Sequence, residues 1–375
     1  MTRSCGKVQV TARVRLEDAD DLAEQYTPGV AELAKRVADD PSVLARETVK
    51  ANSVAIVSDG SALLGLGDQG PAAALPVMEG KAALLKRFAD VDAWPICPVS
   101  REPDDLVRTV KDLATSFGAI NLEDIAAPRC FTVERRLHDE LEVPVFHDDQ
   151  HGTAVAVLAA LHNALELTGR EPAGTSVVVS GAGAAGVAVT RLLLNAGFSA
   201  DRLVVCDRRG ALHGGRDLTG EKLWLAEHTN RGGAAQGSLR DVVREADVFI
   251  GVSAGGLLDE EDIGRMADRA IVFGLANPDP EVDPEAAREH AEVVATGRSD
   301  MANQINNVLV FPGMFRGLLD SGAVRVTTRM LLAAARALAG VVGGDLDREH
   351  IVPSVFDEAL VPAVAEAVAG AAKGG

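Results

Sequence analysis

The most constraining feature of this sequence is a glycine-rich turn between an apolar segment and an Ala/Leu-rich segment. Residues 181–186 read Gly-Ala-Gly-Ala-Ala-Gly, which is the G-x-G-x-x-G pattern. The β-branched run 176–180 before it predicts a strand, and the run 185–195 after it predicts a helix. In that context the glycines allow a tight turn and a close approach of the backbone to a pyrophosphate, which the helix N-terminus attracts. The alternative is a glycine turn that binds no ligand. The predicted cofactor-binding residues of this turn are Gly181, Gly183, Ala184, Ala185 and Gly186.

An acid stands where such a turn needs one. The predicted strand 203–206 ends at Asp207, the position from which a carboxylate binds the adenosine ribose hydroxyls and repels a 2′-phosphate. Asp207 therefore favours NAD. Arg208 and Arg209 follow directly and could instead pair with that phosphate, so NADP stays possible.

The rest of the chain alternates predicted strands with predicted helices, which indicates parallel sheets flanked by helices. Further strands are predicted at 54–57, 93–97, 120–122, 143–146, 248–252, 271–275 and 293–295. Three helices are predicted to start at Pro71, Pro103 and Pro128. A further helix is predicted over 238–246, and a long helix over 153–167 joins the two halves. We therefore predict an α/β protein with an N-terminal α/β domain (1–152), a Rossmann-type doubly wound dinucleotide-binding domain (153–330) and a C-terminal helical segment (331–375).

Composition supports two domains and excludes some partners. A chain of 375 residues is too long for one ordinary core. Its 55 acidic and 37 basic residues give a net charge of −18, which disfavours nucleic acid and anionic membranes. Residues 1–9 contain no apolar signal core, and no apolar run reaches membrane-spanning length, so a cytoplasmic protein is expected. The dispersed cysteines, which suit reduced thiols, are Cys5, Cys97, Cys130 and Cys206.

One lysine lies within an apolar helix face. In the helix predicted to start at Pro71, Lys81 shares helical spacing with Val77, Met78 and Leu84, among other apolar residues. A buried lysine is costly as a cation, so its pKa should fall, which suits a general base. Alternatively, the side chain extends its ammonium group to solvent.

Carboxylates follow two predicted strands. Glu123 and Asp124 come after the strand 120–122, and Asp148 and Asp149 come after the strand 143–146. Open parallel sheets bind their ligands at these carboxyl ends, and oxygen ligands without thiolates favour Mg²⁺ or Mn²⁺. The alternative is that the first pair caps a helix and the second lies in a loop.

Two histidines flank the second acid pair. His147 and His151 might be proposed as zinc ligands, but no H-x-x-x-H helix and no thiolate supports a zinc site here. We expect them to support the acids or the fold.

Ten short segments, in one order along the chain, resemble a known family. They lie at 26–30 (Tyr-Thr-Pro-Gly-Val), 58–60 (Ser-Asp-Gly), 64–67 (Leu-Gly-Leu-Gly), 76–81 (Pro-Val-Met-Glu-Gly-Lys), 121–124 (Asn-Leu-Glu-Asp), 146–154 (Phe-His-Asp-Asp-Gln-His-Gly-Thr-Ala), 181–186, 276–278 (Ala-Asn-Pro), 306–308 (Asn-Asn-Val) and 311–313 (Phe-Pro-Gly). Each segment is weakly specific, but the set is highly specific. The sequence resembles the malic enzyme family, in its short bacterial type.

The resemblance implies roles in proton transfer for three residues. Lys81 matches the family's general base, Asp148 the acid that hydrogen-bonds it, and Tyr26 the general acid. Tyr26, the only tyrosine, could otherwise simply pack.

The resemblance also implies ligands for the metal and the substrate. Glu123, Asp124 and Asp149 match the metal ligands, which makes the N-terminal domain the substrate- and metal-binding domain. Asn307 matches an amide that holds a substrate carboxylate, and Asn277 one that contacts both substrate and cofactor.

One position departs from the larger, eukaryotic-type enzymes. Those enzymes have an arginine that binds malate, and the matching position here is Ala62. The short type generally lacks this arginine too, so the group that binds the far carboxylate of malate is left open. The metal and a partner subunit are candidates, and the short type is typically a homodimer.

The implied reaction is oxidation and decarboxylation of L-malate to pyruvate and CO2, with NAD or NADP reduced and Mg²⁺ or Mn²⁺ required. One alternative is a malolactic-type enzyme, which converts malate to lactate with NAD retained. A second alternative is a catalytically silent NAD-sensing protein. Loss of Lys81, Tyr26 or a metal acid would favour the sensor, and all are present.

Overall fold

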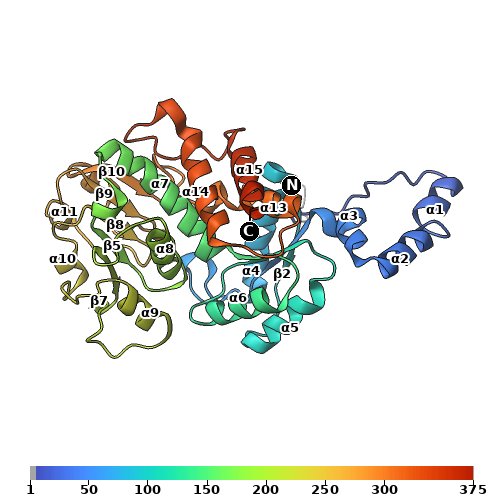
Figure 1. Cartoon of the computed structure of the whole chain (residues 1–375), viewed down its shortest axis with the longest axis horizontal. Coiled ribbons are helices and arrows are strands. Elements are labelled where there is room, and N and C mark those ends of the chain that lie inside the picture. Colours follow the sequence, from blue (N-terminus) through green and yellow to red (C-terminus); the bar gives the residue numbers. More distant parts are fainter. Residues whose placement is uncertain (1–5, 375) are drawn as a thin grey trace, which may run out of the picture.

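The computed structural model describes residues 6–374, so Cys5 lies outside the described residues. Two α/β units lie side by side, and an N-terminal arm extends away from them (Figure 1). Within the described residues, no helix combines the length and the apolarity that a membrane crossing requires.

The first unit contains a four-stranded parallel sheet. Its strands are β1 (Ser53–Val57), β2 (Asp92–Ile96), β3 (Ala119–Leu122) and β4 (Val145–His147), in the order β2-β1-β3-β4. Its helices are α4 (Pro71–Ala89), α5 (Pro103–Leu113) and α6 (Arg129–Glu140). These elements confirm the predicted alternation. β4 begins two residues later than predicted, because Pro144 has no N–H to donate to a neighbouring strand.

The second unit contains a six-stranded sheet in the order β10-β9-β8-β5-β6-β7. The strands are β5 (Val177–Ser180), β6 (Leu203–Asp207), β7 (Gly210–Ala211), β8 (Val248–Gly251), β9 (Ala270–Gly274) and β10 (Ala291–Thr296). All pairs are parallel except β6 with β7, a two-residue hairpin. The helices of this unit are α7 (Thr153–Thr168), α8 (Ala184–Asn195), α9 (Gly220–His228), α10 (Leu239–Val242), α11 (Glu260–Ile263) and α12 (Pro284–Arg288). The arrangement confirms the doubly wound dinucleotide-binding fold.

The predicted helix over 238–246 is shorter in the structure. Ser238 and Asp241 form a capping box that starts α10. Glu245 then adopts a φ of 61°, a left-handed conformation that an α-helix cannot continue through.

The C-terminal helices connect the two units. They are α13 (Phe311–Ser321), α14 (Thr328–Val342) and α15 (Leu360–Ala372). α13 packs against α4 and β3 of the first unit, whereas α14 packs against α7, so one apolar core continues through both units. Gly313 lets α15 approach α13 closely, because a Cβ there would lie 2.6 Å from the Cβ of Val364.

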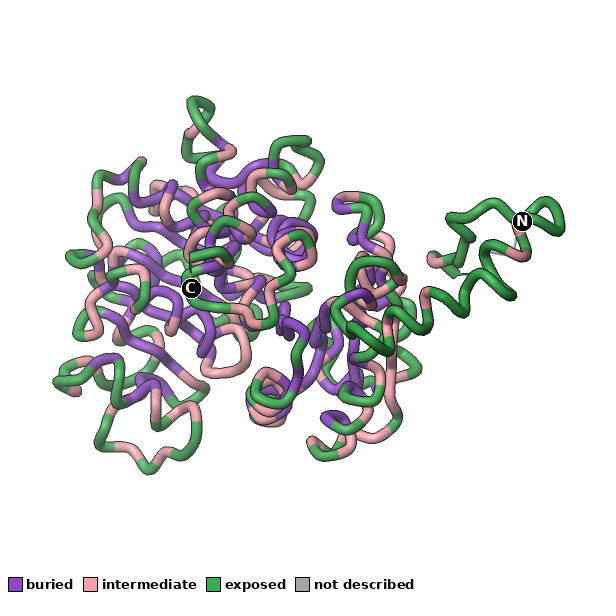
Figure 2. Tube along the Cα trace, turned by 45° about the vertical axis from the view of Figure 1, so that its right-hand side comes forward, coloured by how far each residue is buried: buried purple, intermediate pink, exposed green. Residues whose placement is uncertain are grey.

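The N-terminal arm has almost no core. It contains α1 (Ala19–Gln25) and α2 (Val30–Asp39), and neither helix has a buried residue. The short turns η1 (Pro41–Val43), α3 (Leu44–Glu47) and η2 (Val49–Asn52) lead from the arm into β1. Figure 2 shows the arm as an exposed extension of the chain. The remaining short turns are η3 (Leu63–Gly65), η4 (Asp148–Gly152), η5 (Pro172–Gly174), η6 (Asn307–Leu309) and η7 (Gly343–Asp345).

Candidate active site

A buried lysine sits at the centre of the carboxylates predicted from the sequence. Lys81 is 8% exposed, on the face of α4 that also buries Met78 and Leu85. Its Nζ lies 2.6 Å from Glu123 Oε1 and donates a short hydrogen bond to Asp148. The alternative in which Lys81 extends to solvent is therefore wrong. Leu84, predicted to share this face, lies at its exposed edge.

Two further side chains complete the surroundings of Lys81, and sequence reasoning assigned them no role. The Phe311 ring lies with its centroid 4.4 Å from Lys81 Nζ, in the geometry of a cation–π contact. Asn121 donates a 2.9 Å hydrogen bond to Glu123. The signal for Asn121 was present, since it is a polar residue within a short apolar strand.

The charges of this centre are strongly coupled. Burial lowers the pKa of Lys81, but the three carboxylates around it, chiefly that of Asp148, outweigh burial and hold the pKa above its usual value. Burial raises the pKa of both Asp124 and Asp149, and repulsion from neighbouring carboxylates adds to it. The centre therefore holds more negative charge than its single lysine neutralises.

The chain turns sharply at the first acid pair. β3 ends at Leu122, and Asp124 adopts a φ of 52°, which is unusual for a residue with a side chain. On a regular strand Glu123 and Asp124 would point to opposite faces. Because of the turn, both are buried beside Asp149, whose Oδ2 accepts a 2.7 Å hydrogen bond from the Asp124 backbone N–H.

The donor set suits a divalent cation, although no ready-made coordination shell is present. Within residues 6–374, no three His, Cys, Asp or Glu side chains already stand in a metal-holding arrangement. Asp124 Oδ2 and Asp148 Oδ1 are buried and have no hydrogen-bond partner. A hard cation would coordinate such unpartnered oxygens and stabilise the charged form of a carboxyl group whose pKa is raised. Glu123, Asp124 and Asp149 therefore fit Mg²⁺ or Mn²⁺.

The second acid pair is carried by the π-helical turn η4. Asp148 is fully buried, and a Cβ added at Gly152 would lie 1.9 Å from its Oδ1. Only glycine therefore fits at the end of this turn. The same added Cβ would lie 3.2 Å from the Cβ of Asn307, so the structure brings Asn307 next to Asp148.

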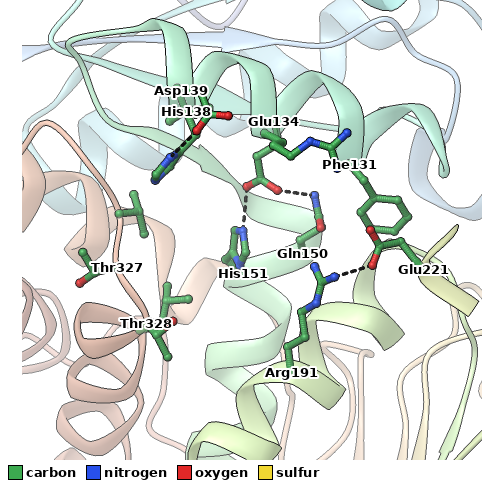
Figure 3. A pocket seen from close by; sticks show the side chains of 14 residues that line it. Phe131, Glu134, His138, Asp139, Gln150, His151, Arg191, Glu221, Thr327 and Thr328 are labelled. Atoms are coloured by element: carbon green, nitrogen blue, oxygen red, sulfur yellow. Dashed lines mark hydrogen bonds and ion pairs between the residues drawn. The ribbon is translucent and has the colours of Figure 1, made fainter. Parts of the chain in front are cut away.

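A glutamate holds the opposite side of η4. Glu134 of α6 accepts a 2.8 Å hydrogen bond from Gln150 and lies 2.7 Å from His151 Nε2 (Figure 3). Burial lowers the pKa of His151, but the nearby Glu134 carboxylate outweighs burial and raises it. These side chains line a cavity of about 350 Å³ between α6, α8 and α14. His151 thus supports the turn, as the sequence suggested.

An ion pair between a buried acid and a partly exposed arginine supports the loop after β1. Asp59 is fully buried, lies 3.0 Å from Arg129 and accepts two hydrogen bonds from Ser61. The backbone N–H of Ala62 donates to the carbonyl of Asp124, which ties this loop to the acid turn.

The dinucleotide turn has the predicted geometry. Gly181 adopts a φ of 127°, and a Cβ there would lie 2.7 Å from the Val252 carbonyl. A Cβ at Gly186 would lie 1.9 Å from the Gly181 carbonyl. Gly183 caps α8, which begins at Ala184 and directs its N-terminus at the turn.

Asn277 lies where the two units meet. A Cβ at Gly65, in the Leu-Gly-Leu-Gly loop of the first unit, would lie 2.5 Å from its carbonyl. Asn277 also lines a cavity of about 320 Å³ with Gly255 and Gly256, next to the carboxyl end of β8. The structure therefore places this predicted residue between the Lys81 unit and the dinucleotide unit.

Tyr26 stands apart from the other predicted residues within the chain. It caps the C-terminus of α1 on the arm and is 66% exposed. Figure 1 shows the arm directed away from α4, which carries Lys81.

A dinucleotide-binding domain joined to a domain with a buried lysine and carboxylates is the architecture of a nicotinamide-dependent oxidoreductase. Residues 150–373 match the family model "Malic enzyme, NAD binding domain", and residues 6–138 match "Malic enzyme, N-terminal domain". The chain belongs to the malic enzyme family, whose reaction is oxidative decarboxylation of malate with NAD(P).

Similar proteins span nearly the whole chain. An NAD-dependent malic enzyme of Geobacillus stearothermophilus is 52% identical over 98% of this chain and 77% of its own length. A bifunctional malic/malolactic enzyme of Bacillus subtilis is 50% identical over 98% of this chain and 90% of its own. The malic enzyme structure from Pyrococcus horikoshii is 46% identical, with a TM-score of 0.94 over 98% of this chain and 87% of its own.

Proposed function

We propose that the Lys81 centre oxidises L-malate and decarboxylates it to pyruvate and CO2, with NAD or NADP as hydride acceptor. The observation that carries the proposal is one buried amine held between Glu123 and Asp148 in the unit adjacent to the dinucleotide turn. The nicotinamide ring, when bound, would accept the hydride from C2 of malate.

Lys81 takes the proton of the C2 hydroxyl as the hydride leaves. Its Nζ is buried and oriented by Asp148 and by the Phe311 ring, so the Lys81 side chain loses little conformational freedom when the transition state forms. The neighbouring carboxylates now keep it protonated. A divalent cation on Glu123 and Asp149 would offset part of their negative charge, so that burial of Lys81 would favour the neutral amine more strongly.

Glu123, Asp124 and Asp149 would hold the divalent cation. When bound, Mg²⁺ or Mn²⁺ supplies Lewis-acid polarisation of the substrate oxygens. The amides of Asn307, beside Asp148, and of Asn277, between the units, orient the malate carboxylates.

Asp149→Asn tests the cation site. We expect the Mn²⁺ concentration for half-maximal activity to rise on the order of tenfold or more, because a charged ligand is lost. Isothermal titration of Mn²⁺ without substrates should show the same loss of affinity. Asp139→Asn, an exposed acid on α6, is the matched control. Wild-type Mn²⁺ affinity in Asp149→Asn would mean that the cation binds elsewhere.

The arm supplies Tyr26 to a second copy of the chain in a homodimer. Its exposed apolar side chains have no core of their own, which is typical of a surface that another chain covers. They are Val10, Val14, Leu16, Leu22, Tyr26 and Val30. In the partner's centre, the Tyr26 hydroxyl protonates C3 of enolpyruvate after CO2 has left.

An assay of purified protein with L-malate, Mn²⁺ and each cofactor tests the function. Formation of NADH or NADPH matched by pyruvate supports it. The Bacillus subtilis relative is named a malic/malolactic enzyme, so lactate should be measured in the same samples. Lactate without free NADH would replace the proposed reaction by the malolactic one, and no turnover of malate would contradict both.

A further inference from the structure

A carboxylate is buried without a cationic partner at the carboxyl edge of the second sheet. Glu281 lies in the loop between β9 and α12 and is fully buried. Within residues 6–374, no cationic side chain forms an ion pair with it. Burying an unpaired charge is costly, so other groups have to stabilise this carboxylate.

Two loops donate backbone hydrogen bonds to this one carboxylate. Glu281 Oε1 accepts a 2.8 Å hydrogen bond from the N–H of Ser253, and Oε2 accepts one of 3.0 Å from the N–H of Ala276. Burial raises the pKa of Glu281, and these two hydrogen bonds oppose the rise. Ser253 lies in the loop after β8 and Ala276 in the loop after β9, so the carboxylate joins the two loops. The fit is close, because a Cβ at Gly251 would lie 2.3 Å from Glu281 Cδ.

The joined loops form the cavity that Asn277 lines. Gly255 and Gly256 come from the loop after β8, and Asn277 comes from the loop after β9. The hydroxyl of Ser253 also lies 3.0 Å from that of Ser180, the residue before the dinucleotide turn. The buried carboxylate therefore ties the Asn277 side of the cavity to the dinucleotide side.

Asn277 depends on its backbone for its position. Its side chain is exposed, and its amide donates one long hydrogen bond, of 3.4 Å, to the Leu275 carbonyl. A hydrogen bond of that length holds a side chain weakly. Ala276 directly precedes Asn277, so the hydrogen bond from Ala276 to Glu281 fixes the backbone from which the Asn277 side chain extends.

We infer that Glu281 is a positioning residue that holds Asn277 in place for the substrate. Because Glu281 is fully buried, it acts through the backbone of Ala276 and not by contact with malate. The inference rests on the proposed function, in which Asn277 orients a malate carboxylate.

The test is a double-mutant cycle between Glu281 and Asn277. Glu281→Gln keeps the size of the side chain but replaces one acceptor by an NH2 group, so one of the two loops loses its hydrogen bond. The kcat/KM for malate should fall by roughly tenfold or more, because displacing a group that positions the substrate slows the reaction. In an Asn277→Ala background, the same substitution should change kcat/KM by less than about twofold, since the positioned amide is already absent. An equally large loss in both backgrounds would overturn the inference.

Asp247→Asn is the matched control for loss of a buried acid. Asp247 accepts a 2.8 Å hydrogen bond from the N–H of Ser176 and pairs with Arg170, at the opposite edge of the same sheet. Its loss should lower the melting temperature and keep kcat/KM for malate within about twofold of wild type. Glu281→Asp is the second variant at the site itself. It keeps the charge but is one methylene too short to reach both loops, so it should show the same dependence on Asn277.

Hydrogen–deuterium exchange tests the two loops without any ligand. In Glu281→Gln and in Glu281→Asp, the backbone amides of 252–258 and 275–281 should exchange faster than in wild type, and in Asp247→Asn they should not. Unchanged exchange over both loops would contradict the role of Glu281 and leave the proposed function intact. No turnover of malate by the unsubstituted protein would overturn the proposed function, and with it the role of Glu281.

Discussion

Lys81→Ala should lower the kcat for malate oxidation by on the order of a hundredfold or more, the scale of general-base catalysis. No other amine is hydrogen-bonded to Asp148 in the described part of the chain, so no neighbour can replace it. Lys86→Ala, on the exposed side of the same helix, is the control and should keep full activity. Small external amines should restore part of the Lys81→Ala activity. A kcat close to wild type would show that Lys81 is not the base.

Loss of fold has to be separated from loss of the base. Removing one partner of a buried ion pair destabilises a protein by about 3–5 kcal/mol, because the remaining charges are left uncompensated. The melting temperature of Lys81→Ala should therefore fall, and Mn²⁺ should restore part of the loss by binding Glu123, Asp124 and Asp149 and so reducing the negative charge of the centre. Oxaloacetate decarboxylation, which needs no hydroxyl deprotonation, should survive better than malate oxidation in a folded variant.

A heterodimer with one Tyr26→Phe chain and one Lys81→Ala chain should recover activity that neither parent variant has. If Tyr26 acts in the partner's centre, one of the two sites in this dimer contains both an intact Lys81 and an intact Tyr26. About half of wild-type activity is then expected, from the twofold symmetry of the assembly. Co-expression with two affinity tags and tandem purification yields the heterodimer for the assay. Activity no higher than that of the parent variants would mean either that Tyr26 acts with Lys81 of its own chain or that Tyr26 has no catalytic role.

Tyr26→Phe alone should separate the partial reactions. Protonation of enolpyruvate follows hydride transfer, so reduction of oxaloacetate by NADH should be spared more than pyruvate formation from malate. Equal loss of both reactions would instead assign Tyr26 to substrate positioning.

Local patterns were enough to predict both sheets and most of the acid–lysine centre. The apolar face of α4 predicted a buried Lys81, and the acids after β3 and β4 predicted the carboxylates around it, because parallel strands bring their carboxyl ends to one edge. The left-handed turn at Asp124, which lets two adjacent acids lie beside Asp149, could not be located from residue types.

Contacts between distant parts of the chain could not be predicted in the same way. Phe311 reaches Lys81 only because α13 returns to the first sheet, which no periodicity encodes. Arg216 and Lys222 neutralise Asp207 from the segment after β7, and no local pattern around Asp207 indicated these contacts. The exposure of Tyr26 follows from the direction of the arm, since the motif around it fixes the residue's identity and not its position.

The most direct test of the central proposal follows the hydrogen at C2 of malate. L-malate deuterated at C2 is incubated with the protein, NAD and Mn²⁺, and the products are analysed by mass spectrometry. Oxidative decarboxylation predicts deuterium in free NADH and unlabelled pyruvate, whose methyl group takes its new proton from solvent. Lactate that carries the deuterium at C2, with no labelled NADH in solution, would contradict the proposed reaction.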